Sequence, residues 1–157
     1  HMWTRRQRQM CIRDSSYMKE FNPGFVIDLA TLTGAVVVAL GGVTSGMMGN
    51  NAEAIERMKS ASAKAGEKVW ELPLHDEYAK QLKSTIADLK NIGGGRAAGA
   101  LTAGCFLNEF VEEAYPWVHL DIAGSSDSPK DQGPHCPDFG GTGVPVQSLV
   151  TFAEELC

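Results

Sequence analysis

FVIDLATLTG, residues 25–34, is the stretch of sequence that decides the fold of this chain. Its first half is a run of large apolar and β-branched residues, which is typical of a strand buried on both faces of a sheet. Its second half turns polar and ends at Gly34. Such a turn presents backbone N–H and C=O groups at the carboxyl edge of the sheet, where open α/β sheets bind ligands. That edge is therefore the strongest candidate for a site that the pattern offers.

A second stretch, WVHLDI at residues 117–122, alternates in polarity and is predicted to be the other main strand. It ends like the first strand, since residues 120–123 (LDIA) repeat the pattern of residues 27–30 (IDLA). If the two strands lie parallel, residues 31–34 and 123–126 meet at one edge. Strands that alternate with helices predict an α/β fold, with a mostly parallel or mixed sheet flanked by helices.

Several helices are predicted around these strands. Asn50 as N-cap and Glu53 three residues later favour a capping box, and Gly66 ends that helix. Residues 35–40 (AVVVAL) fit either a short buried helix or a strand, and residues 43–48 weakly favour a strand. Residues 97–113 predict a buried helix. A final helix begins near Pro145, and its predicted inward face is Val146, Leu149, Val150, Ala153 and Leu156.

The first 14 residues show no helical or strand period, and His-Met at the start resembles a cloning scar. We interpret residues 1–14 as a non-native or disordered leader, and residues 15–157 as the folded part. Residues 15–21 look like the last turns of a helix, stopped by Asn22, Pro23 and Gly24.

Composition excludes several classes of partner. The chain has 157 residues and a formal net charge of −5, so no basic surface predicts a nucleic-acid partner. No apolar run approaches the roughly 20 residues that span a bilayer, and no signal peptide is recognisable. Four scattered cysteines form no CxxC pair. They predict reduced thiols and a cytoplasmic protein rather than a disulfide framework.

Three motifs allow a functional and a structural interpretation. His119 and Asp121 share one face of a strand and could ligate a metal, but a catalytic zinc needs about three protein ligands and no third is evident. A packed histidine beside an aspartate that orients backbone is therefore preferred. Residues 135–138 (HCPD) could bind a soft metal, although a plain loop is favoured. Residues 93–96 (GGGR) could cradle an anion but lack the phosphate-loop pattern.

The residues alone favour an ordinary strand-to-helix turn at 31–34, with an exposed peptide-binding edge as the alternative. Four blocks then carry a family resemblance, namely VIDLATLTGA (26–35), ADLKNIG (87–93), AGALTAGCF (98–106) and WVHLDIAG (117–124). They resemble the C-terminal part of the catalytic domain of the leucyl (cytosol) aminopeptidases, two-metal enzymes that remove N-terminal residues from peptides. The resemblance assigns residues 15–157 to that part.

The resemblance implies a substrate-binding segment at residues 31–34. Thr31, Gly34 and Ala123 are expected to line the pocket for the first side chain of the substrate. The Leu32 carbonyl and the Gly34 N–H are expected to hold its backbone. Thr33 belongs to the same segment, and Ser126 stands where family members often carry a pocket residue. The expected partners are peptides with a free N-terminus.

The resemblance also implies two divalent metal ions, zinc or manganese, and a homohexameric parent enzyme. The family's ligands lie in a Lys/Asp cluster and in an Asn-Thr-Asp-Ala-Glu-Gly-Arg motif, which this sequence lacks. We therefore expect no catalytic residue, no metal ligand and no bound metal in this chain, and no activity from it in isolation. Two alternatives remain: a non-catalytic paralogue with a peptide-binding or assembly role, and an unrelated α/β binding domain.

Overall fold

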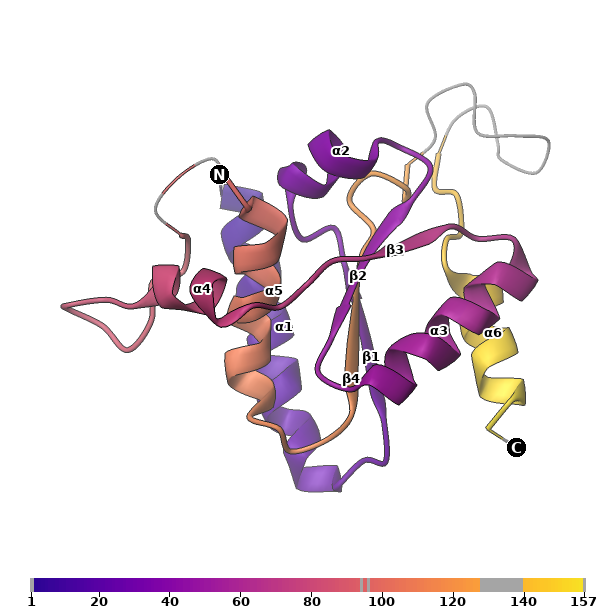
Figure 1. Ribbon diagram of the computed structural model, residues 1–157, viewed down its shortest axis with the longest axis horizontal. Helices are drawn as coiled ribbons and strands as arrows, with labels where there is room; N and C mark the ends of the chain where they lie inside the picture. Colours follow the sequence, from indigo (N-terminus) through magenta and orange to yellow (C-terminus); the bar gives the residue numbers. More distant parts are fainter. Residues whose placement is uncertain (1, 94, 96, 128–139, 157) are drawn as a thin grey trace.

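The computed structural model describes residues 2–93, 95, 97–127 and 140–156. Among these residues, four strands form one sheet with helices on both faces (Figure 1). The strands are β1 (Val26–Ala30), β2 (Ser45–Gly49), β3 (Val69–Glu71) and β4 (Trp117–Asp121), and their order in the sheet is β1-β4-β2-β3. β1 pairs with β4 in parallel and β2 with β3 in parallel, whereas β2 and β4 are antiparallel. The predicted α/β fold with a mixed sheet is confirmed.

The register of β1 against β4 fixes where the two strands end. Asp28 lies opposite His119, and Ala30 lies opposite Asp121. Because the strands are parallel neighbours, the segments that follow them leave the sheet at the same edge. The predicted meeting of residues 31–34 with residues 123–126 is therefore confirmed.

Helices cover the sheet in two groups. Helices α1 and α5 lie on one face, and α3 and α6 lie on the other (Figure 1). The helices are α1 (Met2–Met18), α2 (Gly34–Leu40), α3 (Ala52–Ala65), α4 (Asp76–Ala79), α5 (Gly99–Val111) and α6 (Val146–Glu154), with 3-10 turns η1 (Lys19–Phe21) and η2 (Lys80–Leu82). Among the described residues, no helix combines the length and the apolar character that a membrane crossing requires.

The core is divided by the sheet because successive strand residues point to opposite faces. Trp117 packs with α5 residues such as Phe106 and Leu107 on one face. Val118 and Leu120 pack with Ile55, Met58 and Phe152 on the other. His119 and Asp121 share the face of Trp117 and are fully buried, so polar groups interrupt the α5 side of the core.

Residues 35–40 form the helix α2 rather than a strand. Thr33 explains the choice, because its Oγ1 accepts a hydrogen bond from the Val36 N–H at 3.0 Å and so caps the first turn. Gly41, with φ of 71°, ends the helix. The weakly predicted strand that follows is present as β2.

The cap of α3 is displaced by one residue from the prediction. Asn51, not Asn50, accepts a hydrogen bond from the Ala54 N–H at 3.0 Å. Asn50 instead holds β4, since its Oδ1 accepts from the Trp117 N–H at 2.8 Å and its Nδ2 donates to the Tyr115 carbonyl. Glu53 pairs with Arg57 and closes no capping box.

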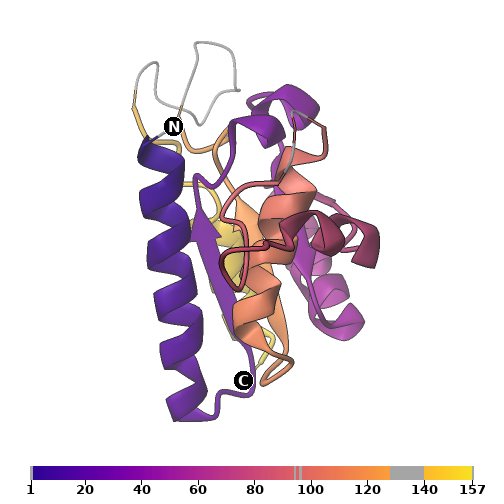
Figure 2. The ribbon, with the colours of Figure 1, turned by 90° about the vertical axis from the view of Figure 1, so that its left-hand side faces the viewer.

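Helical structure begins far earlier than the sequence pattern predicted. Helix α1 runs from Met2 through the expected boundary at residue 15 and packs beside β1 and α5 (Figure 2). Its Arg, Gln and Met residues have good intrinsic helix propensity although they form no apolar stripe, which is why periodicity missed it. Residues 2–14, interpreted from the sequence as part of a non-native or disordered leader, thus lie in α1. The non-native origin of residues 1–14 stays a prediction.

The inward face of α6 also differs from the prediction. Ser148 and Phe152 are buried, whereas Val146, Val150 and Leu156 are more than half exposed. The centroid of the Phe152 ring lies 4.9 Å from that of the Phe25 ring, and this contact places the Phe152 side of the helix against the core. Of the predicted face, Leu149 packs against the core, and Ala153 is exposed.

Candidate functional site at the carboxyl edge of the sheet

The side chain of Asp121 joins the two segments at this edge. Its Oδ1 accepts hydrogen bonds from the backbone N–H groups of Leu32 at 2.9 Å and Thr33 at 3.4 Å. The same oxygen accepts from the Ala123 N–H at 3.2 Å. Its Oδ2 accepts from the Thr33 hydroxyl at 2.7 Å. A single carboxylate at the end of β4 is therefore bonded both to the adjacent Ala123 and to Leu32, which is 89 positions away from Asp121 in the sequence.

The environment of Asp121 acts on its titration in two directions. Burial raises the pKa of the Asp121 carboxyl above its ordinary value. The hydrogen bond from the Thr33 hydroxyl, the nearby His119 and the backbone N–H donors oppose that rise in pKa. Every group bonded to the carboxylate is a donor, which suits an ionised side chain that only accepts.

A second polar pair lies one step back along the strands. His119 Nδ1 lies 2.9 Å from Asp28 Oδ1, which also accepts a hydrogen bond from Trp117 Nε1 at 3.0 Å. Burial lowers the pKa of His119, but the charge and hydrogen bond of Asp28 raise it, and the net shift is upward. Asp28 thus links β1 to two residues of β4 on the buried face of the sheet.

These contacts bear on the two interpretations of His119 and Asp121. His119 is bonded to Asp28, and Asp121 is bonded to backbone and to Thr33. Within the described residues, no three His, Cys, Asp or Glu side chains come together in a way that could hold a metal ion. The preferred interpretation, a packed histidine beside an aspartate that orients backbone, agrees with this geometry.

The segment after β4 is fixed by several further hydrogen bonds. The Ser126 N–H donates to the Ile122 carbonyl at 2.9 Å, and Ser125 Oγ lies 2.6 Å from Ser45 Oγ. Thr142 donates its hydroxyl to the Ser125 carbonyl and its N–H to the Ser126 carbonyl. Sequence reasoning did not identify Thr142, because it lies 16 positions beyond Ser126 in a segment without periodicity.

Position 124, within this segment, requires glycine. A Cβ atom on Gly124 would collide with the backbone carbonyl of Gly41, at the end of α2. The close approach places the end of α2 directly against the segment that follows β4. The two strands, α2 and residues 123–126 thus form one continuous edge.

The six residues predicted to bind substrate all lie on the two segments that Asp121 joins. Thr31, Ala123 and Ser126 are partly exposed, and Gly34 is exposed. Leu32 and Thr33 have buried side chains, so only their backbone can face a ligand. The predicted motifs at 135–138, together with Gly94 and Arg96, lie outside the described residues.

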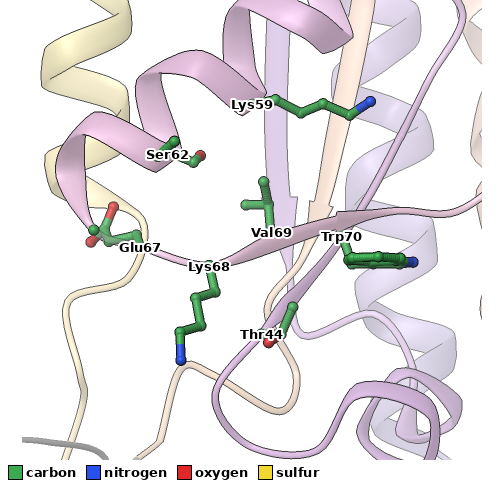
Figure 3. A pocket seen from close by; sticks show the side chains of 9 residues that line it. Thr44, Lys59, Ser62, Glu67, Lys68, Val69 and Trp70 are labelled. Carbon is green, nitrogen blue, oxygen red and sulfur yellow. The ribbon is translucent and has the colours of Figure 1, made fainter.

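Two hollows lie away from this sheet edge. One of about 460 Å³ runs between α3 and β3, where Lys59, Ser62 and Trp70 line it (Figure 3). Lys59 is engaged by Glu56 and Glu71. A second, polar hollow of about 600 Å³ lies near Asn50 and Asn108. Neither is lined by residues 31–34 or 123–126, so the sheet edge is a separate surface.

Comparison with known proteins relates this chain to one group of peptidases. The family model described as "Cytosol aminopeptidase family, catalytic domain" matches residues 10–150. A probable cytosol aminopeptidase of Chloroherpeton thalassium is 49% identical over 136 residues, covering 86% of this chain and 26% of that protein. One from Bdellovibrio bacteriovorus is 41% identical over 140 residues, covering 89% of this chain and 28% of that protein.

A solved structure agrees with these relatives. A mutant of tomato leucine aminopeptidase superposes with a TM-score of 0.86 and 34% sequence identity. The superposition covers 94% of this chain and 28% of the tomato chain. The chain therefore spans little more than a quarter of the length of the proteins that it matches.

Proposed function

The chain belongs to the cytosol aminopeptidase family, and on that premise we propose that its sheet edge binds the N-terminal residue of a peptide. It would do so as part of a two-metal leucyl-type aminopeptidase. The observation that carries the proposal is the Asp121 carboxylate, which brings residues 31–34 and 123 together at the end of two parallel strands. Ligands of open α/β sheets bind at such an edge.

The proposed roles are those that the family resemblance implies. Thr31, Gly34 and Ala123 line the pocket for the first side chain of the peptide, with Ser126 beside them. The Leu32 carbonyl accepts a hydrogen bond from the substrate backbone, and the Gly34 N–H donates one. Thr33 supports this segment from below, because its side chain is buried and bonded to Asp121. An extended peptide is held in this way when it pairs with a strand end.

Hydrolysis needs metal chemistry, for which the described residues offer no cluster of ligands. In the whole enzyme we propose two divalent ions, zinc or manganese, which provide an activated water and polarise the peptide carbonyl. The described residues do not fit such a centre, because they hold no cluster of three ligating side chains. The family's Asn-Thr-Asp-Ala-Glu-Gly-Arg motif is also absent from the sequence. The 157-residue chain is accordingly proposed to bind substrate and not to cleave it.

The family resemblance alone supports the proposals that the whole enzyme is cytoplasmic and homohexameric. A non-catalytic paralogue that binds peptides or assembles with active subunits is the second candidate. The upstream coding sequence distinguishes the two. An intact motif there means an enzyme, and a degenerate motif means a binding or structural role.

Weak binding of leucinamide, followed by saturation-transfer NMR, tests the proposed function. We expect leucinamide to bind more strongly than glycinamide, because only leucinamide fills the side-chain pocket. An Ala123→Leu variant should abolish this preference by filling the pocket. Val38→Leu, on a side chain that is 90% exposed on α2, is the matched control and should retain it. Equal binding of the two amides by the unchanged chain would contradict the proposal.

A further inference from the structure

We propose that Asp121 is a positioning residue, which fixes the direction of the backbone groups that receive the substrate. The expected effect on substrate binding rests on the proposed function, whereas the hydrogen bonds of Asp121 can be tested separately. Four donors, three of them backbone N–H groups, are bonded to this one carboxylate. All four donors lie on the two segments that carry the six proposed substrate-binding residues.

Because the peptide unit is planar, the hydrogen bond of the Thr33 N–H also fixes the direction of the Leu32 carbonyl. The Leu32 carbonyl and the Thr33 N–H belong to one peptide unit, in which a trans bond points the two groups oppositely. Because the Thr33 N–H points inward to Asp121, the Leu32 carbonyl points away from the buried carboxylate. That carbonyl is the group proposed to accept a hydrogen bond from the substrate.

The same geometry acts on the neighbouring peptide units. The Leu32 N–H donates to Asp121 at 2.9 Å, so the Thr31 carbonyl is directed away from the carboxylate. The Ala123 N–H also donates to Asp121, and the Ile122 carbonyl on the opposite side accepts from Ser126. One side chain therefore sets the orientation of peptide units on both sides of the edge.

Thr33 extends this control to α2. Its hydroxyl hydrogen is committed to Asp121 Oδ2 at 2.7 Å, and its oxygen accepts from the Val36 N–H at 3.0 Å. The position of the helix start is thereby coupled to the Asp121 carboxylate. In Asp121→Asn, an NH₂ group replaces one of the two carboxylate oxygens. The N–H or O–H groups that donated to that oxygen are then buried without an acceptor.

The unaltered chain allows a first test by NMR. We expect scalar couplings across the hydrogen bonds, from the Leu32 and Ala123 amide nitrogens to the Asp121 carboxyl carbon. We also expect the amide signals of Leu32, Thr33 and Ala123 to titrate together with that carbon. Amide signals that ignore the Asp121 titration would overturn the inference, whether or not leucinamide binds.

Asp121→Asn provides the second test. We expect the Leu32, Thr33 and Ala123 amides to lose slow hydrogen exchange, and leucinamide affinity to fall at least tenfold. Tyr115→Phe is the control, because it removes a buried hydrogen bond of 2.8 Å to the Ser15 carbonyl at the other end of β4. It should lower stability without weakening leucinamide binding.

Thr33→Val keeps the test decisive if Asp121→Asn does not fold. This variant retains the carboxylate and removes one donor, and we expect a smaller change in the same three amides with weaker leucinamide binding. Unchanged exchange and unchanged affinity in either folded variant would overturn the role of Asp121. Absence of leucinamide binding by the unaltered chain, with the amide couplings present, would instead reject the proposed function alone.

Discussion

Asp28 on the edge strand β1 and the fully buried His119 on β4 form a pair that should make the stability of the fold depend on pH. Since the folded-state pKa of His119 is raised above its ordinary value, its stabilising contribution is fully present below about pH 6.5. That contribution is lost as the pH rises through the folded pKa. We predict that the free energy of unfolding in urea falls as the pH is raised from about 6 towards 9. His119→Gln should flatten this slope, whereas an equal slope in that variant would exclude His119 as its cause.

Gly124 is a residue at which a single methyl group should be costly. Its Cβ position meets the Gly41 backbone carbonyl, which cannot move as a flexible side chain would. We predict that Gly124→Ala lowers the free energy of unfolding by about 1–3 kcal/mol. Gly24→Ala is the matched control, because nothing lies within 4 Å of its Cβ position. Equal stabilities of the two variants would show that the α2 contact is not tight.

At the scale of secondary-structure elements, the start of α3 tests whether Asn51 caps the helix or whether Glu53 contributes through a capping box. Asn51→Ala removes the acceptor of the Ala54 N–H and should lower the free energy of unfolding by about 1 kcal/mol. Glu53→Ala breaks only an exposed ion pair with Arg57 and should cost about 0.3–0.5 kcal/mol. Urea unfolding of the two variants measures both. A larger loss for Glu53→Ala would restore the capping box that the sequence predicted.

The elements also show what sequence could and could not predict. Residues 25–34 and 117–122 carry strong local patterns, so both strands and their shared edge followed from the sequence. The face of α6 did not, because it depends on the contact of Phe152 with Phe25, which are distant in sequence. The last turns of helix α1 were predicted at residues 15–21, but its earlier part was missed because it has no apolar period and packs against α5.

The candidate site was also predicted only in part from the sequence. The location of residues 31–34 and 123–126 followed from strand endings, and their proposed roles followed from the family resemblance. Sequence reasoning preferred an aspartate that orients backbone at Asp121, but it gave no reason to connect that side chain to Leu32 or Thr33. Such a connection needs the register of β1 against β4, in which Ala30 lies opposite Asp121.

At the scale of the whole molecule, we predict that the purified chain does not cleave a leucine anilide, even with added Mn²⁺ or Zn²⁺. The reason is the lack of a fitting cluster of ligands among the described residues and of the family's ligand motif in the sequence. Release of the aniline product, followed by absorbance, is the measurement. A full-length leucine aminopeptidase serves as the positive control. Turnover by the pure chain above a metal-only blank would contradict the prediction.

The most direct measurement of the central claim is an amide chemical-shift map of the isotope-labelled chain during titration with leucinamide. We predict that the largest shifts lie at residues 31–34 and 123–126, on both segments that Asp121 joins. Residues lining the hollow between α3 and β3, such as Ser62 and Trp70, should stay unchanged. Shifts confined to that hollow, or to only one of the two segments, would contradict a single binding edge built from the ends of β1 and β4.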